Sequence, residues 1–147
     1  MEQMPIEILK RDHRKVKELF IDLGDEKDFD DKKRLAERIF KNFETHAKIE
    51  EELFYPEVRS VSMEGEKMIE ESIQEHNKVR GYINELRDFD GGLVEYENKV
   101  REMQQVIDDH VAKEENIVFP FSEKNIGEKL NLGLSAKIMA MKAREMI

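Results

Sequence analysis

A repeated stretch of eleven residues constrains this chain more than any other feature. The first copy, HAKIEEELFYP, begins at His46, and the second copy, HVAKEENIVFP, begins at His110. In both copies a Glu follows the His by four residues and a Pro follows it by ten. Side chains four residues apart on a helix lie on the same face, one turn from each other. Each copy therefore predicts a helix that presents a His and a Glu together.

The repeat extends to the segment that precedes each copy. His13 opens the segment HRKVKELFIDL, and His76 opens the segment HNKVRGYINEL. The two segments share Lys, Val, a basic residue, an acidic residue and Leu at matching offsets. We therefore interpret the chain as two helical hairpins related by an approximate twofold axis, each of which contributes two His and one Glu.

Apolar residues recur at alternating steps of three and four in four segments, which is the spacing of helices that pack on one face. The breaks between them contain Gly, Pro and acidic residues. The predicted helices cover about residues 6–23, 35–53, 69–86 and 100–117, with the second expected to end near Pro56 or shortly beyond and the fourth at Pro120. A fifth helix is expected at about 135–147, with Leu134, Ile138 and Met141 on one side. We expect that side to pack across the end of the bundle; the alternative is a surface presented to a partner. We predict an all-α, up-down-up-down four-helix bundle with an additional short C-terminal helix, in a single domain over residues 1–147.

All four His of the chain fall on these apolar stripes, one on each long helix, together with two Glu. A single His on such a stripe is usually a hydrogen-bonded core residue, but a buried carboxylate costs several kcal/mol unless it is paired or binds a metal. The midpoints between successive His positions fall at or beside the predicted turns, so the six residues should lie level in the bundle. The candidate site is one layer of the core, made of His13, His46, Glu50, His76, His110 and Glu114.

A metal is the expected occupant of this layer. The chain has no Cys, so a metal must bind through nitrogen and oxygen. Neutral imidazole and carboxylate favour Fe, Mn or Zn over Ca or Mg. The two similar halves suit two like ions, with two His for each ion and both carboxylates bridging. The alternative is a bundle in which this layer has only a structural role, either without metal or with bound zinc.

The overall charge and hydropathy narrow the class of partner. The formal net charge of −9 disfavours nucleic acid and anionic membrane surfaces. No apolar run approaches the length of a membrane-spanning helix, and the N-terminal residues lack the layout of a signal peptide. We expect a cytoplasmic protein.

These motifs, with a Pro after each His/Glu pair, resemble the hemerythrin-like (HHE cation-binding) domains over nearly the whole chain. The resemblance implies two non-haem iron ions, joined by an oxo or hydroxo bridge, that bind or react with O2. By matching position, His13 and His46 would hold one iron, and His76 and His110 would hold the other. Glu50 and Glu114 would bridge the two ions.

One departure from the family bears on function. Oxygen-carrying hemerythrins have a fifth His one turn from the ligand on the third helix, where this chain has Ser72 and Arg80. A seventh ligand could come from Tyr55, Glu51 or Tyr82, whose plainer interpretations are an aromatic packed beyond the site, a solvated acid and a core aromatic.

The resemblance therefore implies a protein that binds or senses O2 or a related small oxidant. The alternative is a di-iron redox enzyme, or an iron-homeostasis or iron-centre repair protein, that acts on peroxide or NO. The expected partner is O2 or another small diatomic or peroxide molecule. Whether the protein is an enzyme, and its oligomeric state, stay open.

Overall fold

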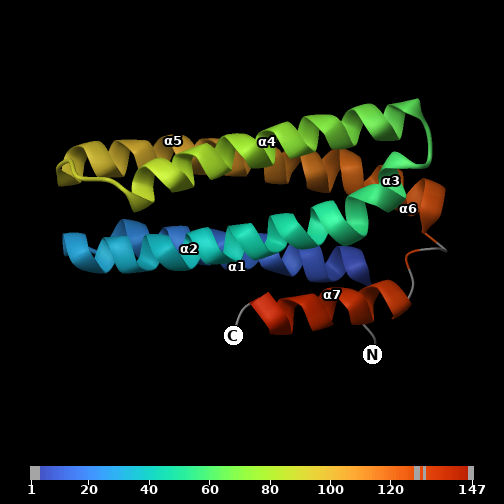
Figure 1. Ribbon diagram of the computed structural model, residues 1–147, viewed down its shortest axis with the longest axis horizontal. Coiled ribbons are helices and arrows are strands. Elements are labelled where there is room, and N and C mark those ends of the chain that lie inside the picture. Colours follow the sequence, from blue (N-terminus) through green and yellow to red (C-terminus); the bar gives the residue numbers. More distant parts are fainter. Residues whose placement is uncertain (1–3, 128–129, 131, 146–147) are drawn as a thin grey trace.

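Four long helices lie side by side and alternate in direction along the bundle (Figure 1). The structure is a computed structural model that describes residues 4–127, 130 and 132–145. The long helices are α1 (Pro5–Asp25), α2 (Phe29–Ile49), α4 (Met63–Arg87) and α5 (Leu93–Lys113). The described part of the chain contains no strand. The predicted all-α, up-down-up-down bundle is confirmed.

A proline or a capping side chain marks the start of three of the four long helices. Pro5 occupies the first turn of α1, where its missing N–H has no cost. The side chain of Asp28 accepts a hydrogen bond from the Asp31 N–H (3.0 Å), and α2 begins at Phe29. Ser62 accepts from the Gly65 N–H (3.2 Å) and begins α4. The short connections between these caps keep successive helices antiparallel.

The two prolines of the repeat lie within helices rather than at their ends. A five-residue π-helical turn, Glu50–Phe54, follows α2, and α3 (Tyr55–Arg59) then continues to a turn. The same arrangement follows α5, with a π-helical turn at Glu114–Val118 and then α6 (Phe119–Ile126). The N–H that Pro lacks is not missed in the first turn of a new helical segment. Each proline follows a π-turn and sits in such a first turn. The second helix therefore continues to Arg59, shortly beyond Pro56 as predicted, whereas the fourth continues past its expected end at Pro120 to Ile126.

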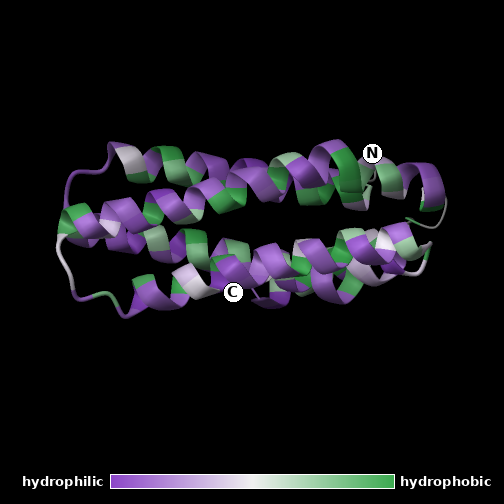
Figure 2. Cartoon of the chain, turned by 90° about the horizontal axis from the view of Figure 1, so that it is seen from above, coloured by the Kyte–Doolittle hydropathy of each residue, from purple (hydrophilic) through white to green (hydrophobic). Residues whose placement is uncertain are grey.

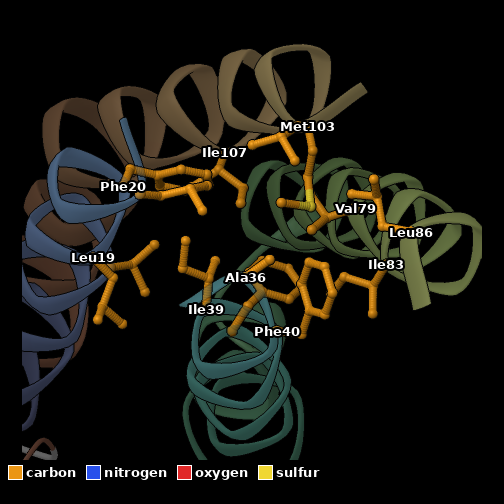
Figure 3. Close-up of a cluster of buried hydrophobic side chains, with 14 of the residues drawn as sticks. Leu19, Phe20, Ala36, Ile39, Phe40, Val79, Ile83, Leu86, Met103 and Ile107 are labelled. Atoms are coloured by element: carbon orange, nitrogen blue, oxygen red, sulfur yellow. The ribbon is translucent and has the colours of Figure 1, made fainter. Parts of the chain in front are cut away.

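The candidate layer divides the apolar core into two clusters. One cluster fills the half of the bundle between that layer and the α1–α2 turn, where Phe20, Ile39, Phe40, Val79 and Ile83 interdigitate (Figure 3). The other surrounds Leu9, Ile49, Phe54 and Phe119 at the opposite half. Hydrophobic and hydrophilic residues alternate along every helix, as expected where one face of each helix is buried (Figure 2).

The fifth helix, α7 (Leu132–Glu145), packs along α1 and α2 (Figure 1). Ile138 is fully buried and Met141 nearly so, in the same cluster as Ile49. The predicted packing of this helix is confirmed, although α7 lies beside the bundle rather than across its end. The expected end of the helix at Ile147 falls outside the described residues. Among those residues, no helix is long and apolar enough to cross a membrane.

Candidate metal centre

The structure brings all six predicted residues together in one buried layer. Glu50, His76 and Glu114 are completely buried, and the other three are at most 8% exposed. Each of the four long helices contributes one His, and the carboxylates stand on the first residue of each π-turn. The predicted layer of four His and two Glu therefore exists in the fold.

The six side chains form two groups that share a carboxylate. The ligand atoms of the first group, made of His13, His46, Glu50 and Glu114, lie within 4.8 Å of one another. Those of the second group, made of Glu50, His76 and His110, do the same. The two groups match the two halves of the sequence repeat, and Glu50 belongs to both.

Each carboxylate faces both halves of the layer. An oxygen of Glu50 lies 3.1 Å from Nε2 of His46 and 3.1 Å from Nε2 of His76. One oxygen of Glu114 lies 3.0 Å from Nε2 of His13, and its other oxygen lies 3.4 Å from Nε2 of His110. This is the placement that two bridging carboxylates require.

A second ring of acids holds the outer nitrogen of every imidazole. Each Nδ1 lies within hydrogen-bonding distance of a carboxylate oxygen, and a carboxylate can only accept, so Nδ1 carries the proton. The four pairs are His13 with Glu115 (2.6 Å), His46 with Asp12 (2.9 Å), His76 with Glu51 (2.6 Å) and His110 with Glu75 (2.7 Å). Such hydrogen bonds fix the tautomer and the orientation of a metal-binding His. They leave every Nε2 directed at the centre of the layer.

The outer acids follow the twofold of the sequence, although they were not predicted. Asp12 and Glu75 directly precede a His, and each accepts from the His of the following long helix. Glu51 and Glu115 directly follow a layer Glu. The available signal was an acid directly before a His (Asp12 and Glu75) and a Glu–Glu pair, both of which occur in each half. The interpretation of Glu51 as a solvated acid is wrong, because it binds His76.

Two buried polar atoms of the layer lack a hydrogen-bond partner among the described residues. Nε2 of His46 and one oxygen of Glu50 are buried without one. Nε2 of His76 and Nε2 of His110 face each other at 3.2 Å. Two imidazole lone pairs at that distance repel unless a proton or a cation lies between them. Buried atoms in native proteins almost always have partners, so the layer fits a bound cation.

The acids raise the pKa values of two imidazoles, those of His46 and His110. Burial alone lowers the pKa of His110, but the carboxylates of Glu114 and Glu75, which accept its hydrogen bonds, raise it to about 10. Burial likewise opposes protonation of His46, but the charge of Glu50 and the hydrogen bond to Asp12 raise its pKa well above the usual value. At these two imidazoles, the attraction of the carboxylates for positive charge therefore exceeds the cost of burying that charge.

Tyr55 breaks the twofold of the layer. It follows Glu50 by five residues, as Phe119 follows Glu114, and each ring stacks on a His: Tyr55 on His76 (centroids 5.5 Å apart) and Phe119 on His13 (5.8 Å). The Tyr55 hydroxyl donates to Glu114 (2.5 Å) and lies 3.1 Å from Glu50. Burial and the charges of both Glu raise the pKa of this phenol well above 10. The interpretation of Tyr55 as an aromatic beyond the site is wrong.

The two positions that flank His76 differ in orientation. Ser72 is 1% exposed, and its hydroxyl has no hydrogen-bond partner. Arg80 reaches outward to Glu51 (2.9 Å) and Asn77, with a third of its side chain exposed. Tyr82, the remaining candidate for a seventh ligand, packs against the apolar cluster between the layer and the α1–α2 turn. This agrees with the interpretation of Tyr82 as a core aromatic.

Comparison with known proteins agrees with this geometry. The hemerythrin HHE cation-binding domain matches residues 4–122. A DNA nickase of Nostoc sp. is 26% identical over 138 residues, which cover 94% of this chain and 39% of the nickase. An uncharacterized hemerythrin-like protein of Schizosaccharomyces pombe is 23% identical over 127 residues, which cover 86% of this chain and 63% of that protein.

The chain thus spans less than two thirds of the length of either relative. No solved structure matches it significantly. The family match nevertheless covers most of the chain, including the four long helices and every residue of the layer. The chain belongs to the hemerythrin HHE cation-binding domain family.

Proposed function

We propose that this protein holds two iron ions in the His/Glu layer and binds or senses O2 there. One observation supports this proposal above all. Every imidazole has its Nδ1–H held by an acid, so that all four Nε2 atoms converge on two buried carboxylates. A hydrogen-bonded core His needs no such second ring. Carboxylate–His pairs of this kind are the usual outer support of metal ligands.

The proposed ligand sets follow the two groups of atoms. His13 and His46 would hold one ion, the two His of the second half would hold the other, and the carboxylates of Glu50 and Glu114 would bridge. A nitrogen and oxygen donor set that contains no sulfur suits Fe, Mn or Zn, and the resemblance to hemerythrin-like domains implies iron. Bound there, iron would supply redox chemistry and coordination positions that the six residues leave open.

A small apolar cavity beside the layer supports a small uncharged ligand. Its volume is about 20 Å³, and its wall includes His13, His46 and His110. The rest of the wall is mainly apolar, from Val16, Phe43, Ile107 and Val111. A space of about 10–15 Å³ holds one water-sized molecule, so the cavity accommodates a diatomic molecule and little more.

A larger surface cavity supplies a route to that space. It has a volume of about 340 Å³, lies between α1 and α5, and reaches His13 and Glu115. Val16, Ile107 and Val111 line both cavities. His13 also lines both cavities, and rotamer changes in the three apolar side chains would join the two spaces for a diatomic molecule.

Tyr55 favours the second candidate, a redox protein that acts on peroxide or NO. Its buried hydroxyl touches both layer carboxylates, so it is placed either to bind one ion or to hold a proton beside it. Phe119 offers no such group at the other half. The activity of the nickase relative is not carried over, because this chain matches 39% of that protein and has a net charge of −9.

Optical spectroscopy with metal analysis tests the proposal. Protein loaded anaerobically with ferrous iron should contain about two iron ions per chain and develop visible absorption when O2 is added. Tyr55→Phe, compared in parallel, reports whether the phenol binds iron, because a phenolate on ferric iron adds a band that the variant would lack. Protein that takes up no iron, or takes up iron and ignores O2, would overturn the proposal.

A further inference from the structure

The fifth helix, α7, reaches the metal layer through one side chain. Lys142 of α7 forms an ion pair with Asp12, and Asp12 accepts the hydrogen bond of His46 Nδ1. Asp12 is largely buried, with 13% of its side chain exposed, and Lys142 is one quarter exposed. The family match ends at residue 122, so this cation comes from a part of the chain that follows the matched domain.

The second half of the bundle has an equivalent cation in a different place. Glu75 accepts the hydrogen bond of His110 Nδ1, and Lys113 lies 3.4 Å from Glu75. Lys113 stands three residues after His110 on the same helix, α5. In this half the cation, the acid and the imidazole are therefore all supplied by the bundle itself.

The first half cannot use that arrangement. The position three residues after His46 is Ile49, which is fully buried in the cluster that includes Ile138 and Met141 of α7. An apolar residue there lets α7 pack on the bundle but removes the local cation. Lys142 of α7 supplies a cation in place of the missing one. The two halves thus reach the same outer chemistry by different routes, one within the bundle and one through an added helix.

We propose that Lys142 is a positioning residue for the metal at His13 and His46, and that α7 completes this half of the site. The cation holds the Asp12 carboxylate in the orientation that accepts the His46 N–H, which in turn aims Nε2 of His46 at the layer. The inference rests on the proposed function, because it concerns residues that would orient a metal ligand.

Metal affinity alone is a poor test of this role. Loss of the lysine charge favours a cation at the site, whereas loss of the Asp12 orientation disfavours it, so the two effects oppose each other. The rate at which the His46 Nδ1–H exchanges with solvent reports directly whether Asp12 still accepts its hydrogen bond. In protein loaded with Co²⁺, a paramagnetic ion, the exchangeable Nδ1–H protons of bound imidazoles give shifted NMR signals that can be counted.

The wild-type protein with Co²⁺ should show four such signals. Lys142→Met should increase the solvent-exchange rate of the His46 signal about tenfold or more, as expected when a charge-assisted hydrogen bond loosens. The other three signals should keep their rates. Lys113→Met should act on the His110 signal instead, and Lys142→Arg should restore the wild-type rate at His46.

Lys48→Met is the matched control, because Lys48 pairs with Glu145 of α7 (2.6 Å) and belongs to no His–acid pair. It should leave all four signals unchanged. Four signals that are also unchanged in Lys142→Met would overturn the inference and leave the metal site intact. Absence of shifted signals in the wild-type protein would instead contradict the proposed function. A change in Lys48→Met equal to that in Lys142→Met would show that α7 acts only through its packing.

Discussion

Each imidazole of the layer has two separate tasks for its two nitrogens. Nδ1 donates to an acid near the surface, and Nε2 faces the buried carboxylates. The six layer residues could be predicted because helical spacing and the repeat fix which positions face the core. The outer acids could not be predicted, because an Asp or Glu beside a His is common on the exposed face of soluble helices. Its hydrogen bond to an imidazole becomes evident only when the position of a second helix is known.

At the same scale, the shared carboxylates lead to a prediction. Replacing Glu50 or Glu114 with Ala should remove both metal ions together, because each carboxylate contacts imidazoles of both halves. Glu52→Ala is the control, since Glu52 follows in the same turn but is exposed. Metal content per folded chain, measured after gel filtration, decides the matter. A Glu50 or Glu114 variant that retains a full complement would disprove bridging by that residue.

The elements of the bundle place these residues in ways that periodicity alone does not show. The π-turns begin at Glu50 and Glu114, and a widened turn of this kind is frequent at functional sites. No residue preference identifies a π-turn, so neither π-turn was predicted, and the continuation of the helix past Pro120 was missed. The helices against which α7 packs could not be predicted either, because an amphipathic pattern shows which face of a helix is buried but does not identify the partner.

The two faces of α4 around His76 give the second prediction. Ser72 is buried and Arg80 reaches the surface, so Ser72→His can add an imidazole to the layer and Arg80→His cannot. The unmodified protein should be oxidised by O2 instead of taking it up and releasing it repeatedly. Ser72→His should increase the number of reversible cycles seen by stopped-flow absorption. Many reversible cycles in the unmodified protein would contradict this expectation and indicate an oxygen carrier.

For the whole molecule, the layer is a polar section between two apolar clusters, and its stability depends on what neutralises it. Removing metal should lower the free energy of unfolding by several kcal/mol if binding is tight, about 4 kcal/mol at a thousandfold excess over Kd. Thermal unfolding before and after verified chelation measures this difference. An unchanged melting temperature would show that the layer does not depend on a bound metal.

The metal-free protein should also respond to pH in a defined direction. The pKa of His110 is raised to about 10, above its ordinary value of about 6.5. Its contribution to stability is therefore fully present below about pH 6.5 and is lost as the pH rises through about 10. The melting temperature of chelated protein should fall over this range, and His110→Gln should flatten the fall. A melting temperature that rises with pH, and does so equally in the variant, would contradict the assignment.

Six residues from four helices are proposed to build one centre for two metal ions. Anomalous diffraction from crystals of the iron-loaded protein, recorded at the iron absorption edge, would locate these ions. We expect two peaks in the buried layer, one beside Nε2 of His13 and His46 and the other beside Nε2 of His76 and His110, with Glu50 and Glu114 between them. A single peak, or peaks only at surface acids, would contradict this proposal.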